Sequence, residues 1–294
     1  MSKAIVTGGH GFVGHYLVEL LEQYGYEVDI FDLKEGWDLR NFEEVRNYID
    51  NVRPDYIFHL AALAFVPESF ANPQRAIDIN ITGSLNILEA VRQLGLKTRI
   101  HLAGTSEEYG DAGPNEDDLL NPQSPYAISK MAMDHLGRLY AKSYGMNVVV
   151  TRAFNHTGAG RGEMYAESAF AKQIVEVERG LREVVTHGNL ESVRNYTDVR
   201  DIVRAYVEAI HLPSGVYNIC SNQNVTMQEV MLTLISKSTE KNIKTEVNPV
   251  LYRPSDFSFK KPSCKKFTDL TGWKPEYKLG DTLEDILNYW RQEL

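Results

Sequence analysis

The chain has 294 residues, of which 43% are hydrophobic, and its 31 basic and 40 acidic residues give a net charge of −9. An acidic chain gains nothing from the counterion release that drives binding to a nucleic-acid backbone. No apolar run approaches the roughly 18 residues of a membrane-spanning helix. Two cysteines and scattered histidines indicate neither a disulfide framework nor a metal site. We therefore expect a soluble, cytoplasmic protein with one large domain and a smaller lobe.

Strand and helix patterns alternate through the first half of the chain. The expected strands cover residues 3–8, 26–32, 55–62, 99–105 and 147–154. The expected helices cover residues 12–25, 41–52, 73–95 and 125–145. Strands separated by helices predict right-handed crossovers and a parallel sheet, so the fold class is α/β with a doubly wound parallel sheet.

Beyond residue 155 the alternation becomes less regular. Helix patterns recur at 166–180, 198–212, 226–238 and 281–293, and short strands are expected near 183–187, 216–220 and 243–248. This half of the chain is predicted to extend the sheet in places and to build a C-terminal lobe elsewhere.

A glycine-rich segment, TGGHGFVG at residues 7–14, separates the first expected strand from the first expected helix. Its glycines follow two overlapping spacings, which start at Gly8 and Gly9 and share Gly11 and Gly14. Glycines permit a tight turn and let backbone amides approach a pyrophosphate, while the helix N-terminus adds partial positive charge. Glycines also make ordinary turns, but the strand–loop–helix context predicts a Rossmann-type dinucleotide-binding domain. The same pattern makes the N-terminus a strand rather than a signal peptide.

Asp32 ends the second expected strand, where a carboxylate could accept hydrogen bonds from an adenosine ribose. Its charge would repel a 2′-phosphate, so it favours NAD(H) as the cofactor. Lys34 and Arg40 are close enough in sequence to keep NADP(H) open. The alternative for Asp32 is a simple turn residue.

Tyr126 and Lys130 lie four residues apart at the start of the expected helix 125–145, so they share one face. A lysine ammonium beside a phenol favours the phenolate and lowers its pKa from about 10. Such a tyrosine can exchange a proton with an alcohol or a ketone near neutral pH. The spacing alone is common on helix surfaces. The glycine loop, and the segment GTSEEYG at the end of the fourth strand, favour the catalytic interpretation.

Together these motifs resemble the extended short-chain dehydrogenases/reductases of the nucleotide-sugar epimerase/dehydratase group. The resemblance runs nearly end to end and also includes DYIFHLAA, INITGSLNILEA, SPYAISK and RAFNHTGAG. It implies a catalytic triad of Thr105, Tyr126 and Lys130, with Glu107 where the dehydratases of the family carry a carboxylate. The implied cofactor site consists of Gly8, Gly11, Phe12, Val13, Gly14, Asp32, Leu60, Ala61, Ala62 and Asn80, together with Tyr126 and Lys130.

Within this group the chain resembles the GDP-mannose branch, through segments such as FAKQIVEVE, HGNLESVRNYTDVRDIVRAY, VYNICS and RPSD. The resemblance implies a GDP-hexose substrate, with Asn155 at the sugar or its phosphate and Arg194 and Arg253 on the diphosphate. Paired arginines suit a diphosphate because their fork-shaped donors carry a permanent charge. The other implied substrate contacts are Lys172, Asn189, Leu190 and Asp256.

The short connection after Asp32, LKEGWDLRNFEE, resembles the reductases of the branch, because its dehydratases carry a longer insertion there. This implies that NAD(P)H reduces the C4 ketone of a GDP-4-keto-6-deoxyhexose to a GDP-6-deoxyhexose of the GDP-rhamnose type. A GDP-mannose 4,6-dehydratase and a nucleotide-sugar 4-epimerase with tightly bound NAD remain alternatives. A dinucleotide-sensing binding protein is the non-enzymatic alternative.

The resemblance also implies a division of the chain and an assembly. Residues 1–155, with parts of 188–222, would form the dinucleotide-binding domain, and residues 156–187 and 223–294 the nucleotide-sugar lobe. In this family the helices corresponding to 73–95 and 125–145 pair across a two-fold axis into a four-helix bundle, so we expect a homodimer.

Overall fold

The computed structural model describes residues 1–252 and 262–294, and the chain divides into two compact units. Unit 1 comprises Met1–Phe154, Ile202–Ile219 and Ser263–Trp273, and unit 2 comprises Asn155–Asp201, Cys220–Pro262 and Lys274–Leu294. Arg253 and Asp256, both expected to bind substrate, lie outside the described residues. Across the described residues, every helix is too short or too polar to cross a membrane.

Unit 1 contains a six-stranded parallel sheet with the strand order β10–β5–β4–β3–β1–β2. Its strands are β1 (Lys3–Thr7), β2 (Glu27–Phe31), β3 (Tyr56–His59), β4 (Arg99–Thr105), β5 (Asn147–Ala153) and β10 (Gly215–Ile219). The chain passes from β1 to β2 and then places β3 on the other side of β1, so the strand order reverses there. Ligands of open parallel sheets bind beyond the carboxyl ends of the strands at such a reversal. The predicted doubly wound sheet is confirmed.

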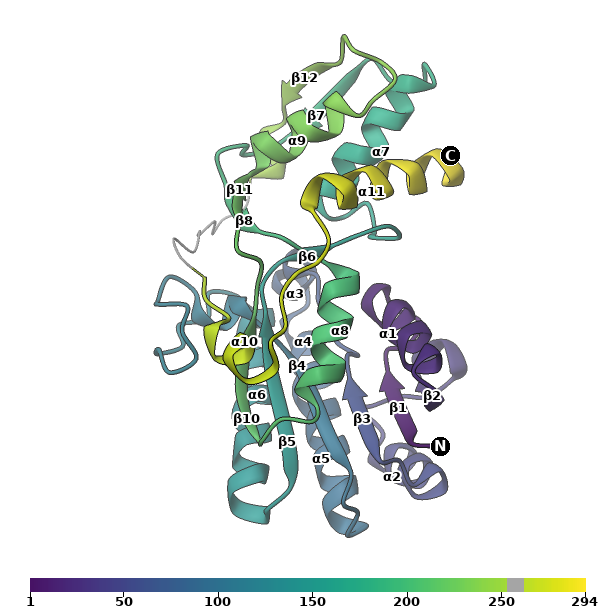
Figure 1. The fold of residues 1–294 in the computed structure, drawn as a ribbon, viewed down its shortest axis with the longest axis vertical. Coiled ribbons are helices and arrows are strands. Elements are labelled where there is room, and N and C mark those ends of the chain that lie inside the picture. The colour runs from purple at the N-terminus through teal and green to yellow at the C-terminus, as the bar shows by residue number, and fades with distance from the viewer. Residues whose placement is uncertain (253–261) are drawn as a thin grey trace. The chain divides into compact units, whose positions relative to one another are not determined.

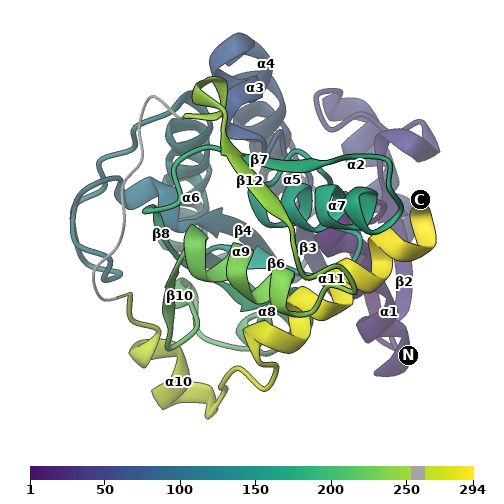
Figure 2. The ribbon, with the colours of Figure 1, turned by 90° about the horizontal axis from the view of Figure 1, so that it is seen from above.

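Helices cover both faces of this sheet, with α2, α5 and α6 on one face and α1 and α8 on the other (Figure 1 and Figure 2). Their bounds are α1 (Phe12–Gln23), α2 (Phe42–Val52), α5 (Gly83–Gln93), α6 (Pro125–Tyr144) and α8 (Val199–Ala209). The core beneath α2, α5 and α6 includes Ile5, Ile57, Ile100 and Val150, each at most 1% exposed. Full burial of such a side chain stabilises the fold by about 1.5–3 kcal/mol.

The expected helix 73–95 differs in detail from a regular helix. It starts at Pro73 as α4 (Pro73–Ile77), passes through a π-helical turn, η2 (Asp78–Thr82), and continues as α5. A further helix that the sequence did not indicate, α3 (Val66–Ala71), precedes it. A π turn holds more residues than an α turn and occurs often at functional sites.

Helix α6 is fixed at its ends and along its length. Ser124 caps its start, where the hydroxyl oxygen accepts a hydrogen bond of 3.0 Å from the Ala127 amide. Gly145 ends it in the left-handed conformation, with φ of 66°. A Cβ atom at Gly137 would lie 2.6 Å from Leu102 Cδ1, so a larger residue there would force the Leu102 side chain to shift where α6 packs on β4.

Unit 2 has its own core, formed mainly by α7 (Ala166–Glu178), α9 (Met227–Ser236) and α11 (Leu279–Glu293). Three two-stranded pairs accompany these helices: β6 (His156–Thr157) with β9 (Thr197–Asp198), β7 (Val184–His187) with β12 (Lys244–Val247), and β8 (Val193–Asn195) with β11 (Asn224–Thr226). The remaining short elements of the described residues are η1 (Leu33–Glu35), η3 (Ser106–Tyr109), η4 (Pro249–Leu251) and, in unit 1, α10 (Lys265–Thr271).

Candidate active site

The glycine turn between β1 and α1 is closed by contacts that only glycine permits. Gly8 has φ of 71°, and a Cβ atom there would lie 2.9 Å from the backbone of Ala61. A Cβ atom at Gly14 would lie 2.2 Å from the carbonyl oxygen of Gly8. The Gly11 amide closes the turn by donating to that same carbonyl at 2.9 Å. The turn therefore brings the N-terminus of α1 close to the end of β1, as a dinucleotide pyrophosphate requires.

The segment after β3 lies against this turn. The Leu60 amide donates to the Thr7 carbonyl and the Ala61 amide to the Thr7 hydroxyl, each at 3.2 Å. Ala62 comes directly after Ala61, and Phe12 and Val13 open α1 on the other side of the turn. The structure thus brings most of the expected cofactor residues together at the reversal of strand order. The glycine geometry fits a bound dinucleotide.

Asp32 lies beside the same turn. One carboxylate oxygen accepts from the Lys34 amide at 2.9 Å, and the other accepts from the His10 amide at 3.2 Å. The Lys34 ammonium donates to the His10 carbonyl at 3.3 Å. Asp32 is therefore both a turn residue and a carboxylate at the glycine loop, so the two interpretations of this residue are compatible.

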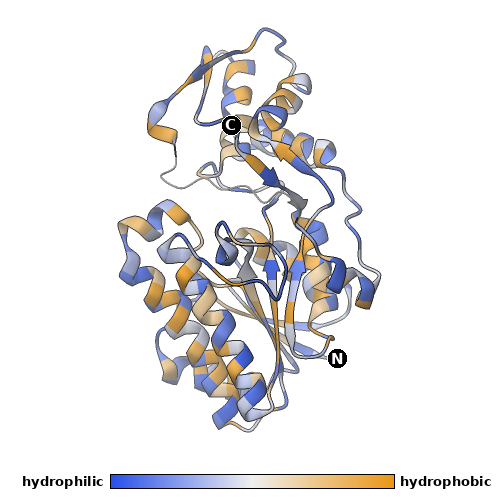
Figure 3. Ribbon diagram, turned by 90° about the vertical axis from the view of Figure 1, so that its left-hand side faces the viewer, coloured by the Kyte–Doolittle hydropathy of each residue, from blue (hydrophilic) through white to orange (hydrophobic). Residues whose placement is uncertain are grey.

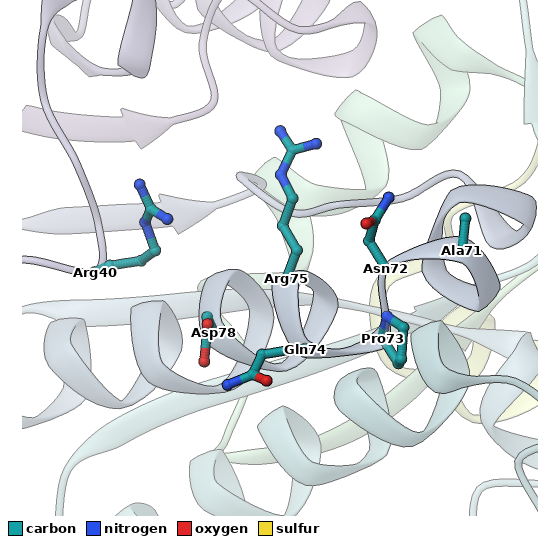
Figure 4. A pocket seen from close by; sticks show the side chains of 7 residues that line it. All are labelled: Arg40, Ala71, Asn72, Pro73, Gln74, Arg75 and Asp78. Carbon is teal, nitrogen blue, oxygen red and sulfur yellow. The ribbon is translucent and has the colours of Figure 1, made fainter.

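Arg40, the other cation that kept NADP(H) open, has a different environment. Its guanidinium pairs with Asp38, with Nη2 2.6 Å from a carboxylate oxygen. It also lines a pocket of about 410 Å³ with residues 71–75 and Asp78. Figure 4 shows the Arg40 and Arg75 side chains extending in the same direction from the loop before α2 and from α4. The Lys34 ammonium thus contacts the glycine turn, whereas the Arg40 guanidinium pairs with Asp38.

The expected catalytic residues lie around the carboxyl end of β4. Thr105 is the last residue of this strand, and the Lys130 ammonium donates to the carbonyl of Ala103, two residues earlier, at 2.7 Å. Tyr126 lies one turn before Lys130 on α6, and its amide donates to the Ser69 hydroxyl of α3 at 3.2 Å. The fold therefore places the helix with the tyrosine–lysine pair directly on the strand that ends in Thr105.

Lys130 is a buried cation, with only 3% of the residue exposed. Burial lowers the pKa of its ammonium to about 8, and the negative charge of Glu108 opposes that shift. Two neighbouring imidazoles, His59 and His101, are fully buried, and burial lowers the pKa of each to about 3. Both imidazoles are therefore neutral near pH 7 and add no charge to the site.

Asn80, an expected cofactor residue in the π turn, has its side-chain amide engaged with protein atoms. Its oxygen accepts from the Leu63 amide at 2.8 Å, and its nitrogen donates to the Ser129 hydroxyl at 2.8 Å. The Ser129 hydroxyl in turn donates to the Tyr126 carbonyl at 2.7 Å. Asn80 therefore connects the loop after β3 to the first turn of α6.

The two glutamates that follow Thr105, Glu107 and Glu108, differ in burial. Glu107 is partly buried in the first turn of η3, and its amide donates to the Thr105 hydroxyl at 3.3 Å. Glu108 is fully buried, and its carboxylate accepts from the Thr105 amide at 2.8 Å. Glu108 was not among the site residues expected from the sequence. The spacing Thr-x-x-Glu of a capping box was the signal that could have found it.

The expected substrate residues that the structure describes all belong to unit 2. Asn155 precedes β6, Lys172 lies on α7, Asn189 and Leu190 follow β7, and Arg194 lies in the middle of β8. The Lys172 ammonium pairs with Glu163 and lies 5.3 Å from the ring centroid of Trp290. Within the described parts of the chain, no group of three or more His, Cys, Asp and Glu side chains is arranged to hold a metal ion.

The chain is similar in sequence and in fold to known proteins. A family model described as GDP-mannose 4,6 dehydratase matches residues 29–286. GDP-6-deoxy-D-mannose reductase of Pseudomonas aeruginosa is 29% identical in an alignment that covers 99% of this chain and 98% of the reductase. The solved structure of RMD from Pseudomonas aeruginosa complexed with NADPH has a TM-score of 0.90 at 28% identity and full coverage of both chains. UDP-glucose 4-epimerase of Thermus thermophilus in complex with NAD has a TM-score of 0.88 at 29% identity, covering 99% of this chain and 100% of the epimerase.

The glycine turn generates a first prediction. The substitution Gly14→Ala should weaken binding of NADH and NADPH by at least about tenfold, because the added methyl group collides with the Gly8 carbonyl and displaces the start of α1. Quenching or enhancement of nicotinamide fluorescence measures the dissociation constant. Gly280→Ala is the matched control, since a Cβ atom on that glycine of α11 meets nothing closer than 4.0 Å. Equal affinities of the two variants would contradict the assignment of the turn.

Proposed function

Since the chain belongs to the GDP-mannose 4,6-dehydratase family of extended short-chain dehydrogenases/reductases, we propose that it is a nucleotide-sugar reductase. Its substrate would be a GDP-4-keto-6-deoxyhexose, and its product a GDP-6-deoxyhexose of the GDP-rhamnose type. The observation that carries this proposal is the buried Lys130 ammonium, bonded at 2.7 Å to the strand that ends in Thr105, one turn from Tyr126. The full-length match to a GDP-6-deoxy-D-mannose reductase supports the choice of substrate.

The proposed roles follow from these positions. A dinucleotide held at the glycine turn would supply the hydride for reduction at C4 of the sugar. The Tyr126 hydroxyl gives its proton to the former ketone oxygen, and the Thr105 hydroxyl donates a hydrogen bond to that oxygen. The Lys130 ammonium stabilises the phenolate that remains on Tyr126 and also binds the nicotinamide ribose.

Reduction is preferred to dehydration on the basis of the segment after β2. This connection is short, because η1 ends at Glu35 and α2 already begins at Phe42. Dehydration would instead require a carboxylate to remove the C5 proton, and Glu107 is the residue that would serve. Epimerisation with a tightly bound NAD remains the second alternative, supported by the likeness to a UDP-glucose 4-epimerase in complex with NAD.

Unit 2 is proposed to bind the nucleotide sugar, and unit 1 to bind the dinucleotide. Arg194 and Arg253 would hold the diphosphate by bidentate, charge-assisted hydrogen bonds. Asn155 would contact the sugar or its phosphate. The remaining nucleotide contacts would come from Lys172, Asn189, Leu190 and Asp256.

Replacing the proton donor tests the reaction directly. With GDP-4-keto-6-deoxymannose and NADH or NADPH, the native protein should consume the reduced dinucleotide in a one-to-one ratio with product. Tyr126→Phe should lower kcat by about a thousandfold, the scale of general acid catalysis, while the dissociation constant of the substrate stays nearly unchanged. Absorbance of the reduced nicotinamide and product mass are the measurements.

The same assay separates the alternatives. Turnover of GDP-mannose without added dinucleotide would identify a dehydratase, and interconversion of C4 epimers without net consumption would identify an epimerase. Full activity of Tyr126→Phe would exclude the proposed proton donor.

The position of Asp32 supports NAD(H) as the preferred cofactor, with NADP(H) as the alternative. The Asp32→Asn variant should shift preference towards NADPH by about tenfold, or about 1.4 kcal/mol, because a 2′-phosphate is then no longer repelled by a negative charge at position 32. The amide oxygen of asparagine can still accept one of the two backbone hydrogen bonds. Ratios of kcat/KM for NADPH and NADH measure the shift, and Asp50→Asn on α2 is the control. An unchanged ratio would refute the role of Asp32.

A homodimer is proposed from apolar side chains exposed on α4 and α6. Ile77, Ile128 and Leu139 are 44%, 46% and 51% exposed, and hydrophobic residues recur along the helices of unit 1 among hydrophilic ones (Figure 3). Exposed apolar side chains gathered on two neighbouring helices are typical of a surface that pairs with another chain. A second copy of this chain would cover them by an isologous contact across a two-fold axis.

Light scattering coupled to size exclusion tests the dimer. The native protein should elute with twice the mass of one chain, and Leu139→Glu should elute as a single chain because it places a charge inside the contact. Leu181→Glu is the control, since Leu181 is 69% exposed but belongs to unit 2, whereas α4 and α6 belong to unit 1. A monomeric native protein would exclude the dimer.

A further inference from the structure

The short helix α3 supplies a hydrogen bond to the residue proposed as the proton donor. Ser69 lies on α3 and has no exposed surface, and its hydroxyl oxygen accepts from the Tyr126 amide at 3.2 Å. The hydroxyl itself donates to the Val66 carbonyl at 2.7 Å. A serine hydroxyl has one proton and two acceptor lone pairs. Since its proton is used within α3, the Ser69 hydroxyl meets Tyr126 as an acceptor.

The start of α6 explains why an acceptor from outside the helix is useful there. Amides in the first turn of a helix have no carbonyl one turn earlier to bond to. Ser124 caps the helix, but its hydroxyl accepts from the Ala127 amide. Tyr126 is the second residue of α6, and its amide donates instead to a side chain that lies 57 positions earlier in the chain. Because Ser69 is buried, we expect that water does not replace its hydroxyl when the hydroxyl is removed.

The carbonyl of Tyr126 is held as well. It accepts from the Ser129 hydroxyl at 2.7 Å, and that hydroxyl accepts from the Asn80 side chain at 2.8 Å. Asn80 and Ser129 are buried, each at most 1% exposed. Fixing the amide and the carbonyl of one residue also fixes the direction of the bond between its Cα and Cβ atoms. Two buried hydroxyl groups, those of Ser69 and Ser129, therefore set the direction in which the phenol leaves the helix.

We propose that Ser69 is a positioning residue for Tyr126: its hydroxyl anchors the Tyr126 amide and thereby holds the phenol in place for proton transfer. This inference rests on the proposed function, because it takes Tyr126 as the proton donor. Ser69 acts through the main chain and takes no part in the proton transfer itself. A displacement of about 1 Å at the reacting groups can lower a rate about a hundredfold. Since Ser129 still holds the carbonyl, we expect the loss of the Ser69 hydroxyl alone to cost less than that.

Two variants remove the acceptor in different ways. Ser69→Ala deletes the hydroxyl, and Ser69→Cys replaces it with a thiol, which occupies the space but is a weak acceptor. In the reduction of GDP-4-keto-6-deoxymannose, both variants should lower kcat about tenfold, because the phenol is no longer held in place for proton transfer. KM for the sugar and the dissociation constant of NADH should change by less than about twofold, since the glycine turn and unit 2 are unaltered.

Ser238→Ala is the matched control. Ser238 is 2% exposed and its hydroxyl accepts from the Glu240 amide at 3.1 Å, but it belongs to unit 2. This variant also loses a buried hydroxyl that binds a main-chain amide, and it should leave kcat unchanged. An equal fall of kcat in Ser238→Ala would overturn the proposal, because any such loss would then lower activity. Native kcat in folded Ser69→Ala and Ser69→Cys would overturn it as well.

A second measurement does not depend on turnover. Hydrogen exchange followed by NMR should show the Tyr126 amide exchanging at least about fivefold faster in both Ser69 variants than in the native protein. The Met133 amide in the middle of α6 should keep its native rate. An unchanged rate at Tyr126 would overturn the proposal. An equal acceleration at Met133 would also overturn it, because the whole helix would then be less stable. If the native protein reduces no keto sugar, the proposed function fails, and the exchange rates still decide whether Ser69 anchors Tyr126.

Discussion

A buried ammonium group joins the helix that carries Tyr126 to the strand that carries Thr105. Lys130 donates at 2.7 Å to the Ala103 carbonyl from a position that is almost inaccessible to solvent. Taking an ammonium out of water costs several kcal/mol, so the surroundings must compensate it. Burial lowers the pKa of the Lys130 ammonium, and the nearby Glu108 opposes that shift. The Arg152 guanidinium lies 3.4 Å from the Glu108 carboxyl group and 2.7 Å from the Asp134 carboxylate. The end of β4, the start of α6 and the buried charges between them thus form one electrostatic unit.

A chain of hydrogen bonds extends this unit towards the glycine turn. The Thr7 hydroxyl at the end of β1 bonds to His59 at 2.8 Å, and the other ring nitrogen of His59 bonds to the Ser84 hydroxyl at 2.8 Å. Ser84 donates to the Asn80 carbonyl at 2.5 Å. Through Ser129, Asn80 is connected to the Tyr126 carbonyl. Buried polar groups that are satisfied in this way define one arrangement of the backbone, here between the expected cofactor loop and the expected proton donor.

The doubly wound sheet and the place of the glycine turn could be predicted because both depend on local patterns with strong physical meaning. Alternating strand and helix signals define the sheet, and the collision of a Gly14 Cβ with the Gly8 carbonyl explains the glycine spacing. The burial of Glu108 could not be predicted from the spacing of apolar residues. The 3-10 turn η3 is too short for that spacing to show which of Glu107 and Glu108 is buried. Helix α3 was missed since it has only six residues. The hydrogen bonds of the Asn80 side chain depend on tertiary contacts that no sequence pattern encodes.

The π turn at Asp78–Thr82 lies between an outward-facing and an inward-facing side chain. Each residue added to a helix rotates the subsequent residues by about 100°, so the extra residue of the π turn sets the rotation of α4 relative to α5. Ile77 on one side of the turn faces solvent, while Asn80 within it is directed into the core. Deleting one residue here would restore a regular helix but would rotate Ile77 to another position on the outer surface. It would also move the Asn80 side-chain amide away from Leu63 and Ser129. An insertion or deletion in this segment would therefore change both the side chains on the outer surface and the hydrogen bonds in the core.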